Sequence, residues 1–143
     1  MPLSDYSSAP RWAFGDSSEL ADRLLELVLA GTKTATCSAL EGYRIDDEPL
    51  PRVGQLDIIL DGLGQPRCVI RNVAVDTIAF RDVDEALARQ EGEGDLSLEY
   101  WRREHQAFFE REYGFSPDML LVFEHFEVIE EFDLPPRNDD KLI

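Results

Sequence analysis

Lys33 is the residue whose type and position most clearly indicate chemistry in this chain. The chain has only two lysines, and the other, Lys141, lies in a polar segment near the C-terminus. Lys33 lies in a run of small and hydroxylated residues, AGTKTATCSAL, in which Thr36 follows three positions later. A hydroxyl group becomes a nucleophile when a base takes its proton, and an ammonium group stabilises the oxyanion that then forms. On residue type alone, a surface lysine and a β-branched strand residue explain Lys33 and Thr36 as well, so neither residue would be chosen on its own.

Glu91 is the third residue considered for a role in chemistry. It is predicted to end a short helix and is followed by Gly92, so its carboxylate is expected to project from a turn into a cleft. Glu93 and Asp95 lie beside it, however, and such a run of acidic residues is typical of a solvated turn. Charge pattern alone favours the solvated turn. A role in chemistry requires a partner from elsewhere in the chain.

Other catalytic and metal-binding patterns are missing from the sequence. His105 is predicted to share a helix face with Trp101 and Phe108, which favours a packed histidine over a member of a Ser-His-Asp triad. Cys37 and Cys68 are expected to be reduced thiols, and together with the two histidines they lack the ligand spacing of a zinc site. G-x-S-x-G, P-loop and dinucleotide-binding patterns are absent from the sequence as well. We expect no metal and no cofactor for hydrolysis of a small substrate.

Composition limits the classes of partner. The chain has 143 residues, of which 43% are hydrophobic and 31% charged, as in one soluble domain. It contains no apolar run of about 20 residues and no secretory signal layout, which predicts a cytoplasmic protein without a membrane partner. The net charge of −16 argues against extended duplex nucleic acid, whose binding depends on phosphate neutralisation. A nucleoside, a nucleotide or a short single-stranded RNA fits better.

The elements that must position these residues follow one another without a repeat or a linker. A helix is predicted to begin at Asp16 as its cap and to end at Gly31. It is followed by a strand over residues 33–40, a hairpin with arms 55–61 and 67–80, two helices between residues 82 and 114, and a strand over 119–129. This order predicts one α+β domain, a small mixed β-barrel with helices packed around it. Its core spans about residues 12–132, with polar tails at 1–11 and 134–143.

Strand geometry places one condition on the site. Residues three apart on a regular strand point to opposite faces of the sheet. Lys33 and Thr36 therefore converge only if Lys33 still belongs to the turn after Gly31, or if the strand is bulged. We predict irregular backbone at Lys33.

The spacing Gly31-x-Lys33-x-x-Thr36 after an amphipathic helix resembles the signature of ASCH domains, a branch of the PUA-like superfamily. Further matching motifs are Pro51-x-x-Gly54 and Ala88-Arg89-Gln90-Glu91, which resembles the A-x-x-E of the family. The stretch Glu91-Gly92-Glu93-Gly94-Asp95, followed by Trp101-x-x-x-His105-x-x-Phe108-Phe109, is similar to the longer bacterial members. The likeness covers about residues 12–129. It implies a PUA-like β-barrel and a role in RNA metabolism.

Three functions follow from this resemblance. Some small ASCH proteins remove an acetyl group from modified cytidine with a lysine, a threonine and a glutamate, and the motifs place these roles on Lys33, Thr36 and Glu91. Other members are ribonucleases acting on single-stranded RNA, and PUA-like domains also bind RNA without cleaving it. We marginally favour amide hydrolysis of an acylated cytidine-type nucleoside, with the ribonuclease and the binding module as alternatives.

Two protonation schemes fit the amide hydrolysis. In the first, the Glu91 carboxylate takes the proton of Thr36, and a protonated Lys33 stabilises the oxyanion. In the second, burial lowers the pKa of Lys33 until the neutral amine is the base. The sequence does not decide between these two schemes.

The expected substrate-binding residues are Thr34, Ser38, Tyr43 and Arg44. Ser38 stands where small ASCH proteins often have an arginine, and Tyr43 has a ring on which a base stacks. A ribonuclease would in addition need arginines, for which the candidates are Arg44, Arg52 and Arg71, or a divalent metal. Carboxylates around Lys33 would thus favour a nucleoside, and several arginines would favour a polynucleotide. The sequence does not set the oligomeric state.

Overall fold

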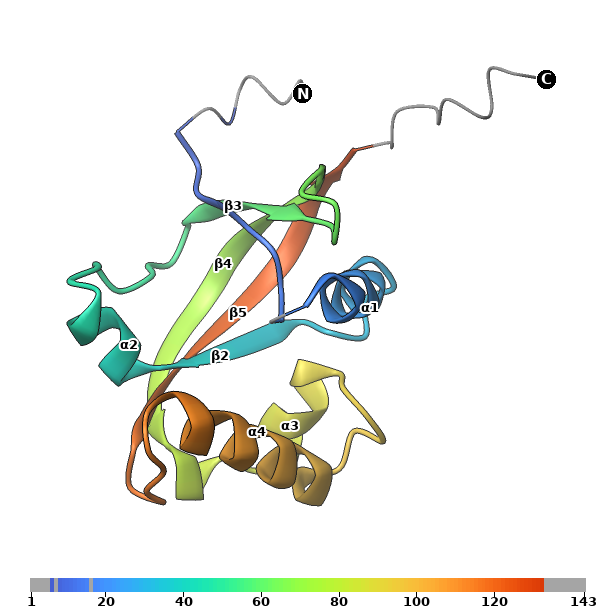
Figure 1. Ribbon diagram of the computed structural model, residues 1–143. Helices are drawn as coiled ribbons and strands as arrows, with labels where there is room; N and C mark the ends of the chain where they lie inside the picture. Colours follow the sequence, from blue (N-terminus) through green and yellow to red (C-terminus); the bar gives the residue numbers. More distant parts are fainter. Residues whose placement is uncertain (1–5, 7, 16, 133–143) are drawn as a thin grey trace.

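The computed structural model of the chain describes residue 6, residues 8–15 and residues 17–132. The described part contains one five-stranded sheet, with helices packed against it (Figure 1). The elements in chain order are β1 (Arg11–Trp12), α1 (Ser18–Leu29), β2 (Ala35–Ala39), α2 (Leu40–Ile45), β3 (Leu56–Leu60), β4 (Pro66–Ala79), the 3-10 helix η2 (Phe80–Asp82), α3 (Glu85–Glu91), α4 (Leu98–Glu112) and β5 (Leu120–Glu131). The predicted α+β class is confirmed.

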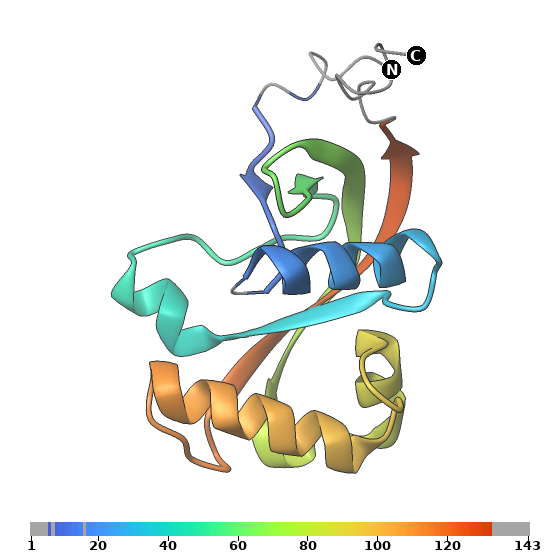
Figure 2. The same ribbon diagram turned by 45° about the vertical axis from the view of Figure 1, so that its right-hand side comes forward.

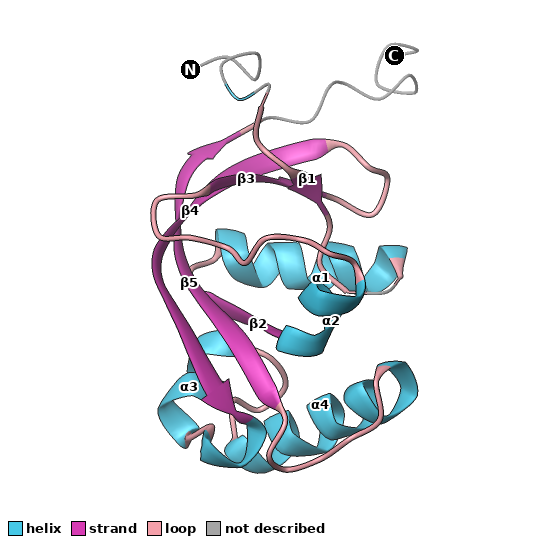
Figure 3. Ribbon diagram, turned by 90° about the vertical axis from the view of Figure 1, so that its left-hand side faces the viewer, coloured by secondary structure: helices cyan, strands magenta, loops and turns pink. Residues whose placement is uncertain are grey.

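The strand order in the sheet is β1-β3-β4-β5-β2. β1 runs parallel to β3, whereas the other neighbours are antiparallel. Figure 3 shows β4 and β5 as long, bent strands around which the sheet curls. The β4–β5 pairing shifts register between Asn72 and Ala74, and such irregularities bend a strand and increase its twist.

Helix α1 packs against the sheet through one apolar face. Ser17 caps the helix by accepting a hydrogen bond from the Leu20 N–H, and Gly31 ends it with a left-handed φ of 81°. The buried face of the helix contacts the middle of the sheet. Its core cluster comprises Leu24, Leu25 and Val28 from α1 together with Phe14, Ile59, Cys68, Ile70 and Phe126. Burying each large apolar side chain stabilises the fold by roughly 1.5–3 kcal/mol, so this face fixes the end of α1 from which Lys33 follows.

Helices α3 and α4 form a second core with β2 and β5. Asp84 and Ser97 cap the two helices with side-chain acceptors. Figure 2 shows α3 and α4 on one side of β2 and α1 on the other. The hydrophobic cluster between helices α3 and α4 and the strands β2 and β5 comprises Ala35, Ala39, Phe80, Val83, Ala88, Trp101, Phe109, Leu121 and Phe123. β2 is therefore shared by both parts of the fold.

The structure differs from the sequence-based expectations at the element ends. The cap of α1 is Ser17, one residue after the expected Asp16, which lies outside the described residues. Helix α2 occupies a segment expected to be a loop, because its Gly42 gives it a low helix propensity. The packed part also begins before residue 12, since Tyr6 is 4% exposed and Arg11 pairs with β3. The expected C-terminal tail, 134–143, lies outside the described residues.

None of the helices in the described part of the chain has the length and apolar content that crossing a bilayer requires.

Candidate functional site

The turn after α1 determines where Lys33 lies. The N–H groups of Thr32 and Lys33 both donate to the carbonyl of Leu27, at 2.9 and 3.0 Å. The N–H of Thr34 then donates to the carbonyl of Gln90 at 2.8 Å, and β2 begins only at Ala35. Lys33 thus belongs to the turn and not to the strand. The predicted irregular backbone at this position is confirmed.

The end of α3 closes directly on this turn. Gly92 ends α3 in the left-handed conformation, with φ of 73°. A Cβ at Gly92 would lie 2.6 Å from the carbonyl oxygen of Thr32 and 2.9 Å from the Cα of Lys33. Only glycine permits both this φ and this close approach. The packing brings Glu91 against Lys33, although the two are 58 positions apart in the chain.

Lys33 and Glu91 form a buried ion pair. Lys33 is 2% exposed and Glu91 is 1% exposed. The ammonium Nζ donates to Glu91 Oε2 at 2.9 Å, to the Glu91 carbonyl at 3.1 Å and to Glu93 Oε2 at 3.1 Å. These three acceptors match the three N–H groups of an ammonium. Glu91 and Glu93 are thus partners of a buried cation, in contrast to the solvated turn that charge pattern favoured.

The pair stays ionised near neutral pH. Burial opposes the charged form of Lys33, but the charges of Glu91 and Glu93 outweigh it, and the pKa of the lysine is raised. Burial likewise opposes the carboxylate of Glu91, but the Lys33 charge outweighs it, and the pKa of Glu91 is lowered. For Glu93 burial prevails, and the pKa of this carboxyl group is raised. A lysine ammonium next to a glutamate carboxylate is the charge state of the first protonation scheme.

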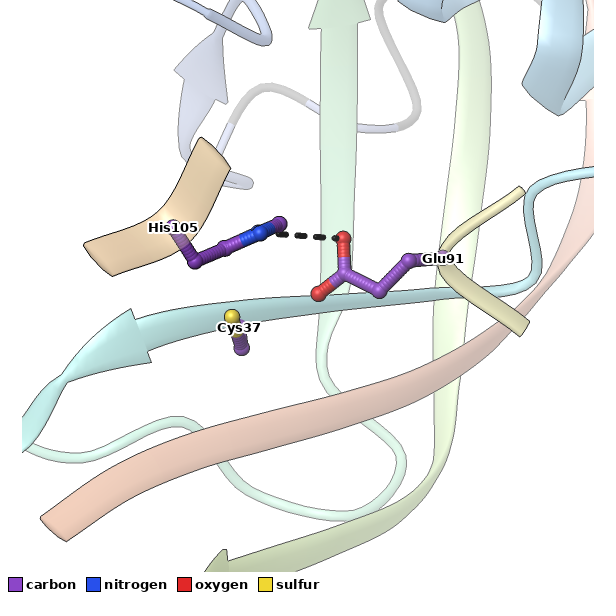
Figure 4. Close-up of side chains that lie close together, drawn as sticks. All are labelled: Cys37, Glu91 and His105. Atoms are coloured by element: carbon purple, nitrogen blue, oxygen red, sulfur yellow. Dashed lines mark ion pairs between the residues drawn. The ribbon is translucent and has the colours of Figure 1, made fainter. Parts of the chain in front are cut away.

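Cys37 and His105 complete the surroundings of Glu91 (Figure 4). His105 Nε2 lies 3.9 Å from Glu91 Oε2, and one ligand atom from each of Cys37, Glu91 and His105 lies within 4.8 Å of the others. Cys37 is partly exposed as a residue, but burial of the thiol, with Glu91 beside it, raises its pKa well above the usual value. Sequence spacing did not identify this group, because its members come from β2, α3 and α4.

Two cavities meet at β2. The first, which we call the lysine cavity, measures about 620 Å³. Its polar lining includes Lys33, Thr36, Cys37, Glu91, Glu93 and His105, together with Arg23, Glu104 and Arg111. The second, which we call the tyrosine cavity, measures about 930 Å³. Its polar wall comprises Thr36, Ser38, Tyr43, Arg52, Asp57 and Glu124. Thr36 and Cys37 border both cavities, so β2 forms a shared wall.

Thr36 and Cys37 leave β2 on opposite faces. Thr36 pairs with Glu124 of β5, and Cys37 pairs with Phe123, so each side chain lies on the face of its partner. All three predicted catalytic residues, Lys33, Thr36 and Glu91, border the lysine cavity, and Lys33 contacts Glu91, but the Thr36 side chain lies on the face of β2 opposite to Cys37, the neighbour of Glu91. Among the described residues, no hydrogen bond joins the Thr36 hydroxyl to Lys33 or Glu91.

The tyrosine cavity contains buried carboxylates that the sequence did not single out. Asp57 is 2% and Glu124 is 8% exposed. Asn72 Nδ2 donates to Glu124 Oε1 at 3.0 Å, and Gln55 Nε2 donates to Asp57 Oδ1 at 2.9 Å. Burial raises the pKa of Glu124, the hydrogen bond from Asn72 opposes this, and the charge of Asp57 adds to the rise. These charged residues occupy strand positions, where sequence analysis expects a solvent-facing side chain.

The predicted substrate-binding residues divide between the cavities and the surface. The hydroxyls of Ser38 and Tyr43 form a hydrogen bond of 2.9 Å at the tyrosine cavity, and burial raises the pKa of Tyr43. Thr34 and Arg44 are exposed and line neither of these two cavities. Nη1 of Arg44 lies 4.0 Å from Oε2 of Glu41.

The arginines considered for phosphate binding do not gather at one cavity. Arg52 borders the tyrosine cavity, whereas Arg71 pairs with Glu127 on the surface. Two arginines that the sequence did not single out, Arg23 and Arg111, border the lysine cavity.

Comparison with known proteins identifies the same family as the motifs. The family model for the ASCH domain matches residues 10–130. A crystal structure of a protein from Enterococcus faecalis V583 is 46% identical, with a TM-score of 0.79, covering 85% of this chain and 77% of that one. The ASCH domain from Lactobacillus crispatus JV V101 is 34% identical, with a TM-score of 0.79, covering 90% and 86%.

A more distant structure shows the fold alone. A variant of an ASCH protein from Zymomonas mobilis is 11% identical, with a TM-score of 0.53, covering 78% of this chain and 70% of that one. No match was found among curated protein sequences. The PUA-like fold expected from the motifs is confirmed by the solved ASCH structures.

Proposed function

The chain belongs to the ASCH domain family, and on this premise we propose that it hydrolyses the amide of an acylated cytidine-type nucleoside. The observation that carries the proposal is the buried Lys33–Glu91 ion pair on the wall of a cavity that Thr36 also borders. Such a pair presents a fixed positive charge and a carboxylate base to a bound ligand. Ionisable groups that border a cavity, and whose pKa values are shifted by burial and by a charged partner, are typical of functional sites.

The proposed reaction is an acyl transfer in two steps. Glu91 accepts the proton of the Thr36 hydroxyl, whose oxygen adds to the acyl carbonyl while Lys33 stabilises the oxyanion. The amino group of the nucleoside then leaves with the proton returned by Glu91. Water, activated by the same carboxylate, hydrolyses the acyl ester on Thr36 and releases the acid. The scheme requires the Thr36 hydroxyl, which lies on the Glu124 face of β2, to reach Glu91 in the substrate complex.

The charges of the two cavities support a nucleoside as substrate. Lys33, the buried cation of the lysine cavity, is already paired with two carboxylates, and the tyrosine cavity adds Asp57 and Glu124. Both features oppose a polyanion and suit a neutral ligand with hydroxyl and amino donors. We place the acyl group at Thr36, where the cavities meet, and the ribose and base in the tyrosine cavity.

The experiment that tests the proposal compares Thr36 of β2 with Thr34, which lies two positions earlier, just before the strand begins. Wild type is expected to release cytidine from N4-acetylcytidine, and Thr36→Val is expected to lose at least about 100-fold in kcat/KM. Thr34→Val carries the same substitution at an exposed position and is expected to retain wild-type activity. Circular dichroism of all three proteins checks their folding. Equal turnover by Thr36→Val and Thr34→Val would remove Thr36 from the mechanism.

Single-strand ribonuclease activity is the second candidate, and one observation favours it. Arg23 and Arg111 border the lysine cavity, where they offer positive charge to a phosphate. The test incubates a short single-stranded RNA with wild type and with Arg23→Ala, in the presence and absence of a chelator. Cleavage that Arg23→Ala weakens, without turnover of N4-acetylcytidine, would establish the ribonuclease in place of the amidohydrolase. Binding of either ligand without turnover would establish a binding module.

A further inference from the structure

We infer that Cys37, Glu91 and His105 form a binding site for one divalent transition-metal ion of the Zn²⁺ type. Figure 4 shows the three side chains converging, with the His105 ring and one Glu91 oxygen facing each other and the Cys37 sulfur beside them. One ligand atom from each residue lies within 4.8 Å of the other two. The residues come from β2, α3 and α4, which the second hydrophobic core holds together. The folded scaffold thus brings the ligands together without a metal.

The donor set fits zinc better than magnesium or calcium. Thiolate, imidazole and carboxylate are the ligands that Zn²⁺ takes in proteins, at about 2.3, 2.0 and 2.1 Å. In a tetrahedron, those bond lengths place neighbouring ligand atoms about 3.3–3.6 Å apart. His105 Nε2 and Glu91 Oε2 are 3.9 Å apart. Binding therefore requires small side-chain rotations and no change of backbone.

His105 is already oriented as a ligand. Its Nδ1 lies 2.9 Å from the carbonyl oxygen of Trp101, which can only accept, so Nδ1 carries the proton and donates. The neutral ring then offers the lone pair of Nε2 to the Glu91 side. The Trp101 ring stacks on the imidazole at 4.3 Å between centroids and 16° between planes, which fixes the ring orientation. A metal-binding histidine almost always has such an outer hydrogen bond to a carbonyl or carboxylate.

Glu91 supplies a second observation that indicates a ligand. Its Oε2 accepts from Lys33, whereas its buried Oε1 has no nitrogen donor among the described residues, and the Cys37 thiol is hydrogen-bonded to the same carboxylate. Buried carboxylate oxygens are normally satisfied, so one that lacks such a donor indicates a missing partner. Oε1 is therefore a second candidate ligand atom beside Oε2, which lies 3.9 Å from His105 Nε2 and also accepts from Lys33.

The local charges accommodate a divalent ion. Lys33 and the ion bring three positive charges, and Glu91, Glu93 and a Cys37 thiolate bring three negative ones, so the occupied cluster is neutral. The lysine cavity of about 620 Å³ opens onto all three ligands. It provides an entry path and room for a fourth ligand such as water. Three protein ligands with an open fourth position are typical of exchangeable zinc sites rather than closed structural ones.

Occupancy would alter the proposed hydrolysis. The ion takes up the carboxylate that acts as the base, so Zn²⁺ is expected to inhibit release of cytidine at one equivalent. This expectation rests on the proposed function, whereas metal binding itself does not. Binding is therefore measured directly, without substrate.

The test titrates the metal-free full chain with Co²⁺ and then displaces Co²⁺ with Zn²⁺. Wild type is expected to bind one equivalent and to develop a near-ultraviolet charge-transfer band from the thiolate to Co²⁺. Cys37→Ser is expected to lose this band, and His105→Asn to bind at least about tenfold more weakly. The matched controls are Cys68→Ser and His125→Asn, which replace the other cysteine and histidine and are expected to bind like wild type.

Two results would overturn the site. Co²⁺ binding without the band, equal in all variants, would show that the acidic surface alone binds the ion. A band that persists in Cys37→Ser would place the thiolate elsewhere. A second measurement needs no variant that must fold: one equivalent of Zn²⁺ is expected to displace Co²⁺ from wild type and to abolish the charge-transfer band. A band that persists in excess Zn²⁺ would contradict the inference.

Discussion

Strand β2 separates two cavities that hold buried carboxylates in different ways. In the lysine cavity, the cation Lys33 pairs with Glu91 and Glu93. In the tyrosine cavity, Asp57 and Glu124 accept their hydrogen bonds from neutral amides of Gln55 and Asn72. The pKa of Glu91 is lowered by its cation, whereas the pKa of Glu124 is raised because burial outweighs an amide donor.

In our proposal, the different partners of the buried carboxylates give the two cavities different roles. A carboxylate that stays ionised next to a buried ammonium can move a proton and stabilise charge as it develops. Carboxylates that accept hydrogen bonds from side-chain amides offer further acceptors to the hydroxyl and amino groups of a ligand, so they suit ligand recognition. The comparison predicts that substitutions in the lysine cavity change the chemistry and the stability strongly. Substitutions in the tyrosine cavity are expected to have smaller effects and to change substrate binding.

The largest effect is expected from Lys33→Met. Removing the ammonium leaves the buried carboxylate of Glu91 without a partner, which costs about 3–5 kcal/mol of the free energy of unfolding. The measurement is urea unfolding of wild type, Lys33→Met, Glu91→Leu and the double variant.

The double variant serves as the control in this cycle. It replaces both charges by apolar side chains of similar size, so it is expected to recover most of the loss from either single substitution. Additive losses in the double variant would show that the two residues do not stabilise each other.

Glu124→Gln is expected to raise stability at neutral pH, by less than Lys33→Met lowers it. The folded protein holds this carboxyl group at a raised pKa, so its contribution is fully present below the ordinary pKa of glutamate. That contribution is lost as pH rises through the raised pKa. The gain in Tm of the variant over wild type is therefore expected to appear only above that pH range.

The exposed substitution Glu41→Gln is the control for this titration. Its effect on Tm is expected to be small, because the Glu41 side chain is exposed. A gain for Glu124→Gln that is the same at acidic and neutral pH would contradict the role of burial.

Tyr43→Phe is expected to have the smallest effect. It removes the hydrogen bond between the hydroxyls of Ser38 and Tyr43, which contributes about 1 kcal/mol to stability. Because the tyrosine cavity binds the nucleoside in our proposal, KM for N4-acetylcytidine is expected to rise while kcat stays unchanged. Steady-state kinetics measure both, and a drop in kcat with constant KM would move Tyr43 from binding to the chemical step.

Local signals were enough to predict the Lys33 side of the site. Gly31 marks the end of α1, and strand parity required either a turn at Lys33 or a bulged strand if Lys33 and Thr36 were to converge; the structure has the turn. The resemblance to ASCH domains then linked Glu91 to Lys33, which contact each other across 58 positions. Most strands and helices were also predicted, because their apolar periodicity is strong.

The remaining features depend on contacts between elements that are distant in sequence. Cys37 and His105 meet Glu91 only because β2 and α4 pack on the same core, and no spacing along the chain records that contact. Asp57 and Glu124 are charged residues in strands, and they are buried where β3 and β5 border the tyrosine cavity. Helix α2 was not predicted, because it is short and its Gly42 lowers the helix propensity of the segment.

The most direct test of the account compares Glu91→Gln with wild type in the release of cytidine from N4-acetylcytidine. Glu110→Gln, an exposed position on α4, provides the same substitution away from both cavities. The account predicts turnover by wild type and Glu110→Gln, and a loss of at least about 100-fold in kcat for Glu91→Gln, with the fold retained by circular dichroism. Turnover by Glu91→Gln at the wild-type rate would contradict the claim that the buried Lys33–Glu91 pair performs the chemistry.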